Sequence, residues 1–312
     1  MGAGRKKLVV EIKKWAQQAN LGALINQIKQ LPGAGLLVAD YVNPNMADTF
    51  REQGVQFIDT VGNAFIDQAP VYIFVKGHRE ELDYLPNQGG AKRAFEPRGL
   101  VVTYAFLCEP ELMNAPYREI VKHTGVAMGT VVEVLKALKE GGFIREDNHK
   151  KRHFTHYRKL LNRWIEVWPE KLKPKYFVGA FVAEDANWWK KIKLANYGGY
   201  WGGEVAASKF TGYLNPQVAT IYMHDQKRVN FLKDARLQKL TEWREEKTGT
   251  LLLYTPFWPQ VADWGKTRDT IDLVDPLLVY ADLIATADPR NMEVAEMIYD
   301  EYIAQHCRED RL

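Results

Sequence analysis

The amino-acid sequence predicts an α+β protein of several domains with a winged helix-turn-helix at its centre. Three observations predict this class. The 312 residues correspond to two or three domains, since a domain takes roughly 150 residues. Hydrophobic spacing changes several times between the period of a strand and that of a helix. A Pro- and Gly-rich stretch, residues 86–99, predicts a linker behind a first domain at residues 1–95.

Composition excludes several classes of protein. With 46% hydrophobic and 26% charged residues, the chain has the composition of a globular protein and not of a disordered one. Its longest apolar run, residues 100–108, is about half of what a membrane helix needs. Residues 1–15 lack the unbroken apolar run of a secretory signal. Two cysteines make neither a disulfide framework nor a four-cysteine zinc site. We therefore expect a cytoplasmic protein that has no membrane partner.

The first domain is predicted to be a small α/β unit. Helical spacing over residues 8–19 and 24–31 predicts one or two helices. Behind them we expect a helix at residues 45–53 and four strands, at residues 35–41, 55–59, 63–67 and 71–76. Val61, Gly62 and Asn63 form a turn signal, which predicts a hairpin between the second and third of these strands.

This first domain also has the outline of a degenerate restriction-endonuclease-like fold. Asp59 ends one predicted strand, and Lys76 ends another in the place of an acid-x-Lys motif. PD-(D/E)xK nucleases need two carboxylates on a divalent metal ion and a lysine near the attacking water. Phe74 stands where the second acid belongs, although Asp67 or Asp40 could substitute for it. We interpret the domain as a relic without activity and keep a metal-dependent nuclease as an alternative function.

Charge is unevenly distributed along the chain. The formal net charge is only +3. Residues 145–175 hold ten Lys and Arg against four Asp and Glu, a local charge of +6, whereas residues 263–312 carry −7. A basic stretch on an otherwise neutral body is typical of a binding site for a polyanion, although it also fits a solvated helix face.

The strongest motif lies in the second predicted domain, residues 96–175. Pro116 suits the first turn of a short helix, and Gly125 suits its end. A longer helix is expected from residues 127–128 onward, with a buried stripe formed by Val131, Val134, Leu135 and Leu138. Gly141 and Gly142 end it, and a strand and a basic loop follow. This order is that of a winged helix-turn-helix, although such a pair of helices can also serve only for packing or dimerisation.

The motif predicts which residues bind DNA. The N-terminal residues of the second helix enter the major groove and meet base edges, the first helix crosses the backbone, and the wing contacts phosphates or the minor groove. The predicted DNA-binding residues are Tyr117, Arg118 and Lys122 on the first helix, Met128, Thr130, Val131 and Lys136 on the second, and His149, Lys150, Lys151, Arg152 and His153 in the wing.

Residues 176–312 are predicted to form a C-terminal α/β domain. Eight of the nine tryptophans lie beyond residue 160, which indicates a separate core. Helical patterns at residues 203–211, 276–285 and 292–305 mix with strand patterns at residues 220–224 and 249–254. Glu204 could be a catalytic acid or a carboxylate that stabilises a helix start.

No catalytic or cofactor motif stands out. His149, His153 and His156 have the spacing of metal ligands, but the neighbouring Lys and Arg repel a cation and no fourth ligand is near. The chain has no phosphate-binding loop, dinucleotide fingerprint or nucleophile elbow. We therefore expect no metal, no cofactor and no enzymatic activity.

Four stretches together resemble the AbiEi-type antitoxin and transcriptional-regulator family of type IV toxin–antitoxin systems. They are residues 36–66, the helix-turn-helix with its NAPYREI lead-in, residues 197–216 and residues 275–303. The resemblance implies a DNA-binding repressor, often of its own operon, whose C-terminal part neutralises a nucleotidyltransferase-like toxin in paired systems. In many members the winged helix is N-terminal, whereas here residues 1–95 precede it.

We interpret the protein as a bacterial, sequence-specific repressor that binds double-stranded DNA. A protein-binding antitoxin acting through the C-terminal domain and the metal-dependent nuclease remain alternatives. The sequence leaves open whether a cognate toxin exists and whether a homodimer binds an inverted repeat.

Overall fold

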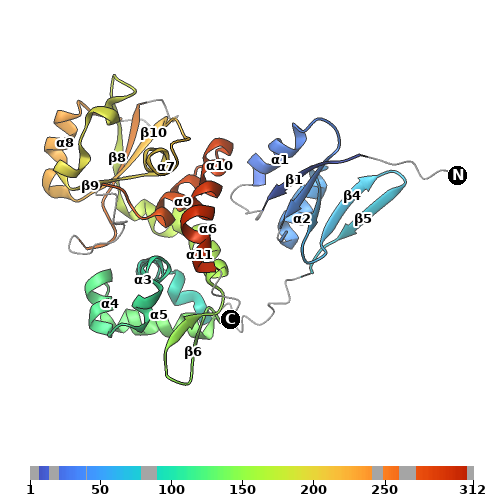
Figure 1. The fold of residues 1–312 in the computed structure, drawn as a ribbon, viewed down its shortest axis with the longest axis horizontal. Coiled ribbons are helices and arrows are strands. Elements are labelled where there is room, and N and C mark those ends of the chain that lie inside the picture. The colour runs from blue at the N-terminus through green and yellow to red at the C-terminus, as the bar shows by residue number, and fades with distance from the viewer. Residues whose placement is uncertain are drawn as a thin grey trace. The chain divides into compact units, whose positions relative to one another are not determined.

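The computed structural model describes residues 7–13, 21–39, 41–78, 90–240, 249–259 and 272–307. The chain divides into two compact units, Met1–Tyr84 with Ala287–Pro289, and Leu85–Thr286 with Arg290–Leu312. Helices and several sheets occur together, which confirms the α+β class (Figure 1). The division into 1–95, 96–175 and 176–312 stays a prediction.

The first unit is built on a five-stranded sheet with the order β1-β2-β3-β4-β5. The strands β1, β2 and β3 are parallel, and β4 and β5 add to them as antiparallel strands. The helix α1 lies between β1 and β2 in the chain, and α2 between β2 and β3 (Figure 1). Their bounds are β1 Val9–Lys13, α1 Leu21–Lys29, β2 Gly35–Ala39, α2 Pro44–Glu52, β3 Gln56–Asp59, β4 Ala64–Gln68 and β5 Val71–Val75.

The core of this unit lies on one face of the sheet. Leu37, Phe57 and Phe65 of the strands pack with Phe50 of α2 and the apolar residues of α1. The prediction of α1, α2, the strands β2 to β5 and the hairpin between β3 and β4 is confirmed.

The predicted helix over residues 8–19 is wrong, because the described part of that range contains the strand β1. Val10 and Ile12 are β-branched and lie opposite Leu36 and Val38 of β2 in a parallel register. β-Branched residues favour strands, and pairing along a sheet outweighs a local helical spacing.

The N-terminal half of the second unit is mainly helical. Its elements are η2 Gly90–Phe95, α3 Pro97–Cys108, η3 Pro110–Asn114, α4 Tyr117–Thr124, α5 Met128–Glu140, β6 Ile144–Glu146, β7 Arg152–Phe154 and α6 Tyr157–Lys171. The described part of the predicted linker, residues 90–99, is therefore helical, and the linker prediction is wrong there. A Cβ atom on Gly99 would clash with the carbonyl oxygen of Arg93. The glycine thus permits close packing of η2 on α3 instead of flexibility.

The C-terminal half of the second unit holds a sheet with the order β11-β8-β12-β10-β9. The strands β10 and β12 are parallel, and the other pairs are antiparallel. The helices α7 and α9 pack on each other, and α7 packs on β10 (Figure 1). The elements are η4 Lys173–Tyr176, β8 Phe177–Val182, β9 Gly199–Gly202, α7 Gly203–Thr211, β10 Val218–Met223, α8 Arg228–Asp234, β11 Gln238–Lys239, β12 Thr250–Tyr254, α9 Pro276–Ile284, α10 Pro289–Ile298, the π-helix Tyr299–Ile303 and α11 Ala304–Cys307.

A cluster of aromatic rings joins the helices of this unit to its sheet. The ring of Phe257, which follows β12, lies 5.0 Å from Tyr104 of α3 and 5.3 Å from Trp168 of α6. Trp258 lies 5.7 Å from Tyr222 of β10. The two halves thus share one buried core, which explains why residues 85–286 form a single compact unit.

Candidate nucleic-acid interface

The helices α4 and α5 meet at a tight turn. Gly125 ends α4 with φ of 66°, which is the left-handed conformation that glycine adopts freely. The Thr124 hydroxyl donates to the carbonyl oxygen of Ile120 at 2.7 Å and accepts from the backbone N–H of Val126 at 3.2 Å. Val126 is buried behind the turn. The two predicted helices and the glycine stop between them are present.

One face of α5 is buried and the other is exposed. The predicted stripe of Val131, Val134, Leu135 and Leu138 is buried, and α5 packs on η2 and α3. Val131 has no exposed surface. Val131 therefore lies in the core, whereas Met128 and Thr130, which are also predicted to bind DNA, lie at the accessible start of the same helix. A base contact needs an exposed side chain, so Val131 is left out of the interface.

The start of α5 presents open backbone amides. Ala127 precedes the helix and provides no side-chain cap, whereas Asn43 caps α2 and Asp275 caps α9. Met128, which follows Ala127, is 44% exposed, and Thr130 is half-buried. Uncapped N–H groups and the positive end of the helix dipole make a site for a phosphate group.

The strands β6 and β7 form an antiparallel hairpin in which Glu146 pairs with Arg152. At its tip, one carboxylate oxygen of Asp147 accepts from the backbone N–H groups of His149 at 2.8 Å and Lys151 at 2.9 Å. The other oxygen lies 3.1 Å from Nε2 of His153. The hydrogen bond to His153, then the one from the backbone of Lys151, lowers the pKa of Asp147 below its usual range. Asp147 thus fixes the shape of the tip.

Asn114 and Arg152 fix the hairpin to the start of α4. The Asn114 side chain accepts from the backbone N–H of Arg152 at 2.7 Å and donates to its carbonyl oxygen at 3.0 Å. The Arg152 guanidinium donates to the carbonyl oxygen of Met113 at 2.6 Å and to the Tyr117 hydroxyl at 3.1 Å. Neither Asn114 nor Asp147 is among the predicted site residues, because each acts through hydrogen bonds to backbone groups, which residue type and spacing do not indicate.

The predicted residues therefore divide into three groups. Arg152, whose side chain is 18% exposed, and His153 hold the hairpin in place. Val131 is buried. The exposed or half-buried group consists of Tyr117, Arg118, Lys122, Met128, Thr130, Lys136, His149, Lys150 and Lys151.

Two lysines of the exposed group form ion pairs with a glutamate, and a third, Lys150, has an unusual backbone conformation. Lys136 lies 3.7 Å from Glu140, and Lys151 lies 3.4 Å from Glu111. Both pairs are exposed, so they exchange easily for other partners. Lys150 is exposed at the tip with φ of 62°, a conformation that costs a residue with a side chain roughly 1 kcal/mol.

The nuclease residues of the first unit have structural partners. Asp59 is buried and accepts from the backbone N–H groups of Val42, Val61 and Asn63 and from the Asn63 side chain, at 2.7 to 3.1 Å. Lys76 binds Asp48 at 2.6 Å. Asp40 lies outside the described residues. These bonds use the Asp59 carboxylate to hold the turn between β3 and β4.

Glu204 is likewise committed to structure. Its carboxylate accepts from the backbone N–H of Gln217 at 2.6 Å, from Arg290 at 3.0 Å and from the Asn291 side chain at 2.9 Å. Over the described ranges, no group of three His, Cys, Asp or Glu side chains is arranged to hold a metal ion. In the same ranges, no helix has both the length and the apolar character to cross a membrane.

Part of the chain matches one family of known proteins. Residues 153–304, just under half of the chain, match a family model described as transcriptional regulator, AbiEi antitoxin, type IV TA system. The match runs from β7 to the first residue of α11 and contains two of the four resembling stretches, residues 197–216 and 275–303. The helices α4 and α5 precede it. No curated protein and no solved structure matches the chain.

Proposed function

We propose that the protein, whose residues 153–304 match a family model of AbiEi antitoxins and transcriptional regulators of type IV TA systems, binds double-stranded DNA through α4, α5 and the β6–β7 hairpin. The family is regulatory and not enzymatic. The family match does not include α4 and α5, so the DNA-binding proposal depends on the geometry of these elements themselves.

The order and packing of these elements support a winged helix-turn-helix. A short helix, a glycine turn, a longer helix and a hairpin follow one another, and the hairpin is bonded to the start of the first helix. In such motifs the second helix enters the major groove while the first lies across the backbone. In this proposal α5 is the recognition helix and the hairpin is the wing.

The observation that carries the proposal is the exposed basic tip of the hairpin. The side chains of His149, Lys150 and Lys151 are exposed to solvent. Behind them, Arg152 and Asn114 form the hydrogen bonds that hold the hairpin in place. A rigid base under exposed cations suits phosphate binding, because few side chains must be ordered when DNA binds.

The residues then take separate roles. Met128 and Thr130 contact base edges in the major groove. Met128 suits the methyl group of thymine, and the Thr130 hydroxyl can form a hydrogen bond with a base. The uncapped start of α5 binds a phosphate. The remaining phosphate contacts come from Tyr117, Arg118, Lys122, Lys136, His149, Lys150 and Lys151.

The antitoxin role belongs to the matched region in this proposal. Residues 176–312 would bind a nucleotidyltransferase-like toxin, and residues 96–175 would bind the operator. The shared aromatic core between these two parts is then the physical connection between toxin binding and DNA binding. Binding of a homodimer to an inverted repeat is part of the same proposal, and a footprint with two equal half-sites would support it.

Titration of labelled DNA tests the proposal. The protein is added to a duplex from the promoter upstream of its own gene and to a random duplex of the same length, at a series of salt concentrations. We expect tighter binding to the promoter. Thr130→Ala should lose about 1–3 kcal/mol on the promoter duplex and little on the random one.

Lys136→Ala is the matched control on the same helix, because loss of a phosphate contact weakens binding to both duplexes equally. Equal, salt-independent binding of the two duplexes by the wild-type protein would contradict the proposal. A protein that binds neither duplex but neutralises a co-expressed toxin would instead be a protein-binding antitoxin.

A further inference from the structure

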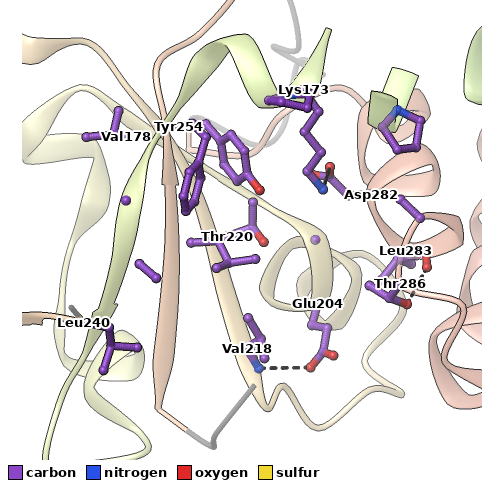
Figure 2. Close-up of a pocket in the computed structure, with 18 of the residues that line it drawn as sticks. Lys173, Val178, Glu204, Val218, Thr220, Leu240, Tyr254, Asp282, Leu283 and Thr286 are labelled. Carbon is purple, nitrogen blue, oxygen red and sulfur yellow. Dashed lines mark hydrogen bonds and ion pairs between the residues drawn. The ribbon is translucent and has the colours of Figure 1, made fainter. Parts of the chain in front are cut away.

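The C-terminal sheet carries a cavity that the proposed function does not use. It lies between the face of β8, β10 and β12 and the segment that contains α9, and its volume is about 650 Å³ (Figure 2). Sites for small organic molecules have volumes of about 300–1,000 Å³. All of its lining residues lie in the second unit.

Most of the wall is apolar. Val178 of β8, Val218 of β10 and Leu252 and Tyr254 of β12 line the sheet side, and Leu283 of α9 lies opposite (Figure 2). Tyr254 is 6% exposed and presents an aromatic surface. Such a wall favours the apolar or aromatic body of a ligand.

The buried charges of the lining are already balanced. Nζ of Lys173 lies 2.9 Å from Asp282 and 5.4 Å from the centre of the Tyr254 ring. The Tyr222 hydroxyl donates to the same Asp282 carboxylate at 2.9 Å. Glu204 is neutralised by Arg290, and Lys239, at the rim, is exposed to solvent. A ligand that placed a net charge beside these pairs, away from Lys239, would lose its hydration without gaining a counter-charge, which is costly.

One polar group in the wall is available to a ligand. Thr220 of β10 is 5% exposed, and no hydrogen bond joins its hydroxyl to any residue that the structure describes. A Cβ atom on Gly203 would lie 2.7 Å from this hydroxyl oxygen, so the glycine keeps the space in front of it open. The hydroxyl oxygen of Thr220 keeps some accessible surface and belongs to the cavity lining, so a ligand in the cavity can form a hydrogen bond with it.

We propose that this cavity binds an electrically neutral, mainly apolar organic molecule that makes a hydrogen bond with Thr220. The site is separate from α4, α5 and the hairpin, and it does not depend on DNA binding. The volume, the apolar wall, the balanced charges and the Thr220 hydroxyl each select the same class of ligand.

A matched pair of fluorescent dyes tests the proposal on the full chain. N-phenyl-1-naphthylamine is neutral and carries one N–H donor, and 8-anilinonaphthalene-1-sulfonate has the same skeleton with an added negative charge. Val178→Trp fills the cavity, and Val229→Trp makes the same change at a position that is 76% exposed. Binding in the cavity is measured as the part of the dye fluorescence that is lost in Val178→Trp and kept in Val229→Trp. Circular dichroism checks that both variants are folded.

We expect saturable binding of the neutral dye in the wild-type protein and in Val229→Trp, and at least tenfold weaker binding of the charged dye. Thr220→Val keeps the side-chain shape and should weaken neutral-dye binding about 2- to 10-fold, as expected for one hydrogen bond. Neutral-dye binding that is absent from the wild-type protein, or that persists in Val178→Trp, would overturn the proposal. Equal affinity for the two dyes would overturn the neutral-ligand assignment, and unchanged affinity in Thr220→Val would overturn the role of that hydroxyl.

Discussion

The tip of the β6–β7 hairpin and the cavity of the C-terminal sheet both contain lysines, but they use them in opposite ways. Lys150 and Lys151 at the tip are exposed, and the pairing of Lys151 with Glu111 is loose at 3.4 Å. Lys173 in the cavity is 16% exposed and bonded to the buried Asp282. Exposed charge is available to a charged partner and contributes little to folding, whereas buried charge is cancelled by its partner and belongs to the fold.

The largest expected effect is the loss of the buried partner. Asp282→Ala leaves the Lys173 ammonium in a mostly buried position without its carboxylate and removes the acceptor of the Tyr222 hydroxyl. We expect the free energy of unfolding to fall by roughly 3–5 kcal/mol in urea denaturation. Glu166→Ala is the control, because it breaks the exposed pair with Arg163 and should change stability by less than about 1 kcal/mol. Similar losses in the two variants would contradict the contrast between buried and exposed charge.

A smaller effect is expected at the base of the hairpin. Asn114→Ala removes two hydrogen bonds to the backbone of Arg152. We expect a loss of about 1–2 kcal/mol in the free energy of unfolding and faster hydrogen exchange at the Arg152 amide. Asn148→Ala makes the same change at the exposed tip and should leave both quantities nearly unchanged. If Asn114→Ala does not change exchange at Arg152, the hairpin is held by other contacts.

At the tip itself, stability and DNA affinity should move in opposite directions. Lys150 has a positive φ, so Lys150→Gly removes local strain and should raise the free energy of unfolding by up to about 1 kcal/mol. In the proposed interface the same variant loses a phosphate contact, so the slope of log affinity against log salt should fall by about 0.9.

Lys150→Ala is the matched control, since it removes the charge but keeps the Cβ atom. It should lose affinity without gaining stability. A salt slope that stays the same in both variants would exclude Lys150 from the DNA interface.

The same contrast shows which features a sequence can predict. The helices α4 and α5 follow from local signals, namely Pro116, Gly125 and the spacing of four apolar residues, and the structure places them within one or two residues of the prediction. Local spacing alone indicates a helix where the structure has β1, because the strand that pairs with β1 is β2, which lies beyond α1 in the sequence.

The cavity escaped prediction for a similar reason. Lys173, Thr220 and Asp282 come from three elements that are distant in the sequence, and they share no motif. The sheet order, in which β8 and β10 flank β12, forms the wall that contains Thr220, whereas η4 and α9 bring Lys173 and Asp282 to the cavity from outside the sheet. The cavity is therefore formed by packing between elements that are distant in the sequence, and local sequence patterns do not indicate such packing.

The smallest expected effect concerns Asp147 and acid. Its pKa is lowered in the folded hairpin, first by the hydrogen bond to His153 and then by the backbone N–H of Lys151. A carboxylate with a lowered pKa contributes stability that is fully present above its unfolded pKa and is lost as the pH falls through the folded pKa. We therefore expect the amides of His149 and Lys151 to keep their protection at neutral pH and to lose it only in acid, as measured by NMR. In Asp147→Asn the amide oxygen can still accept hydrogen bonds but does not titrate, so this acid transition should disappear, and its persistence would assign the transition to another group.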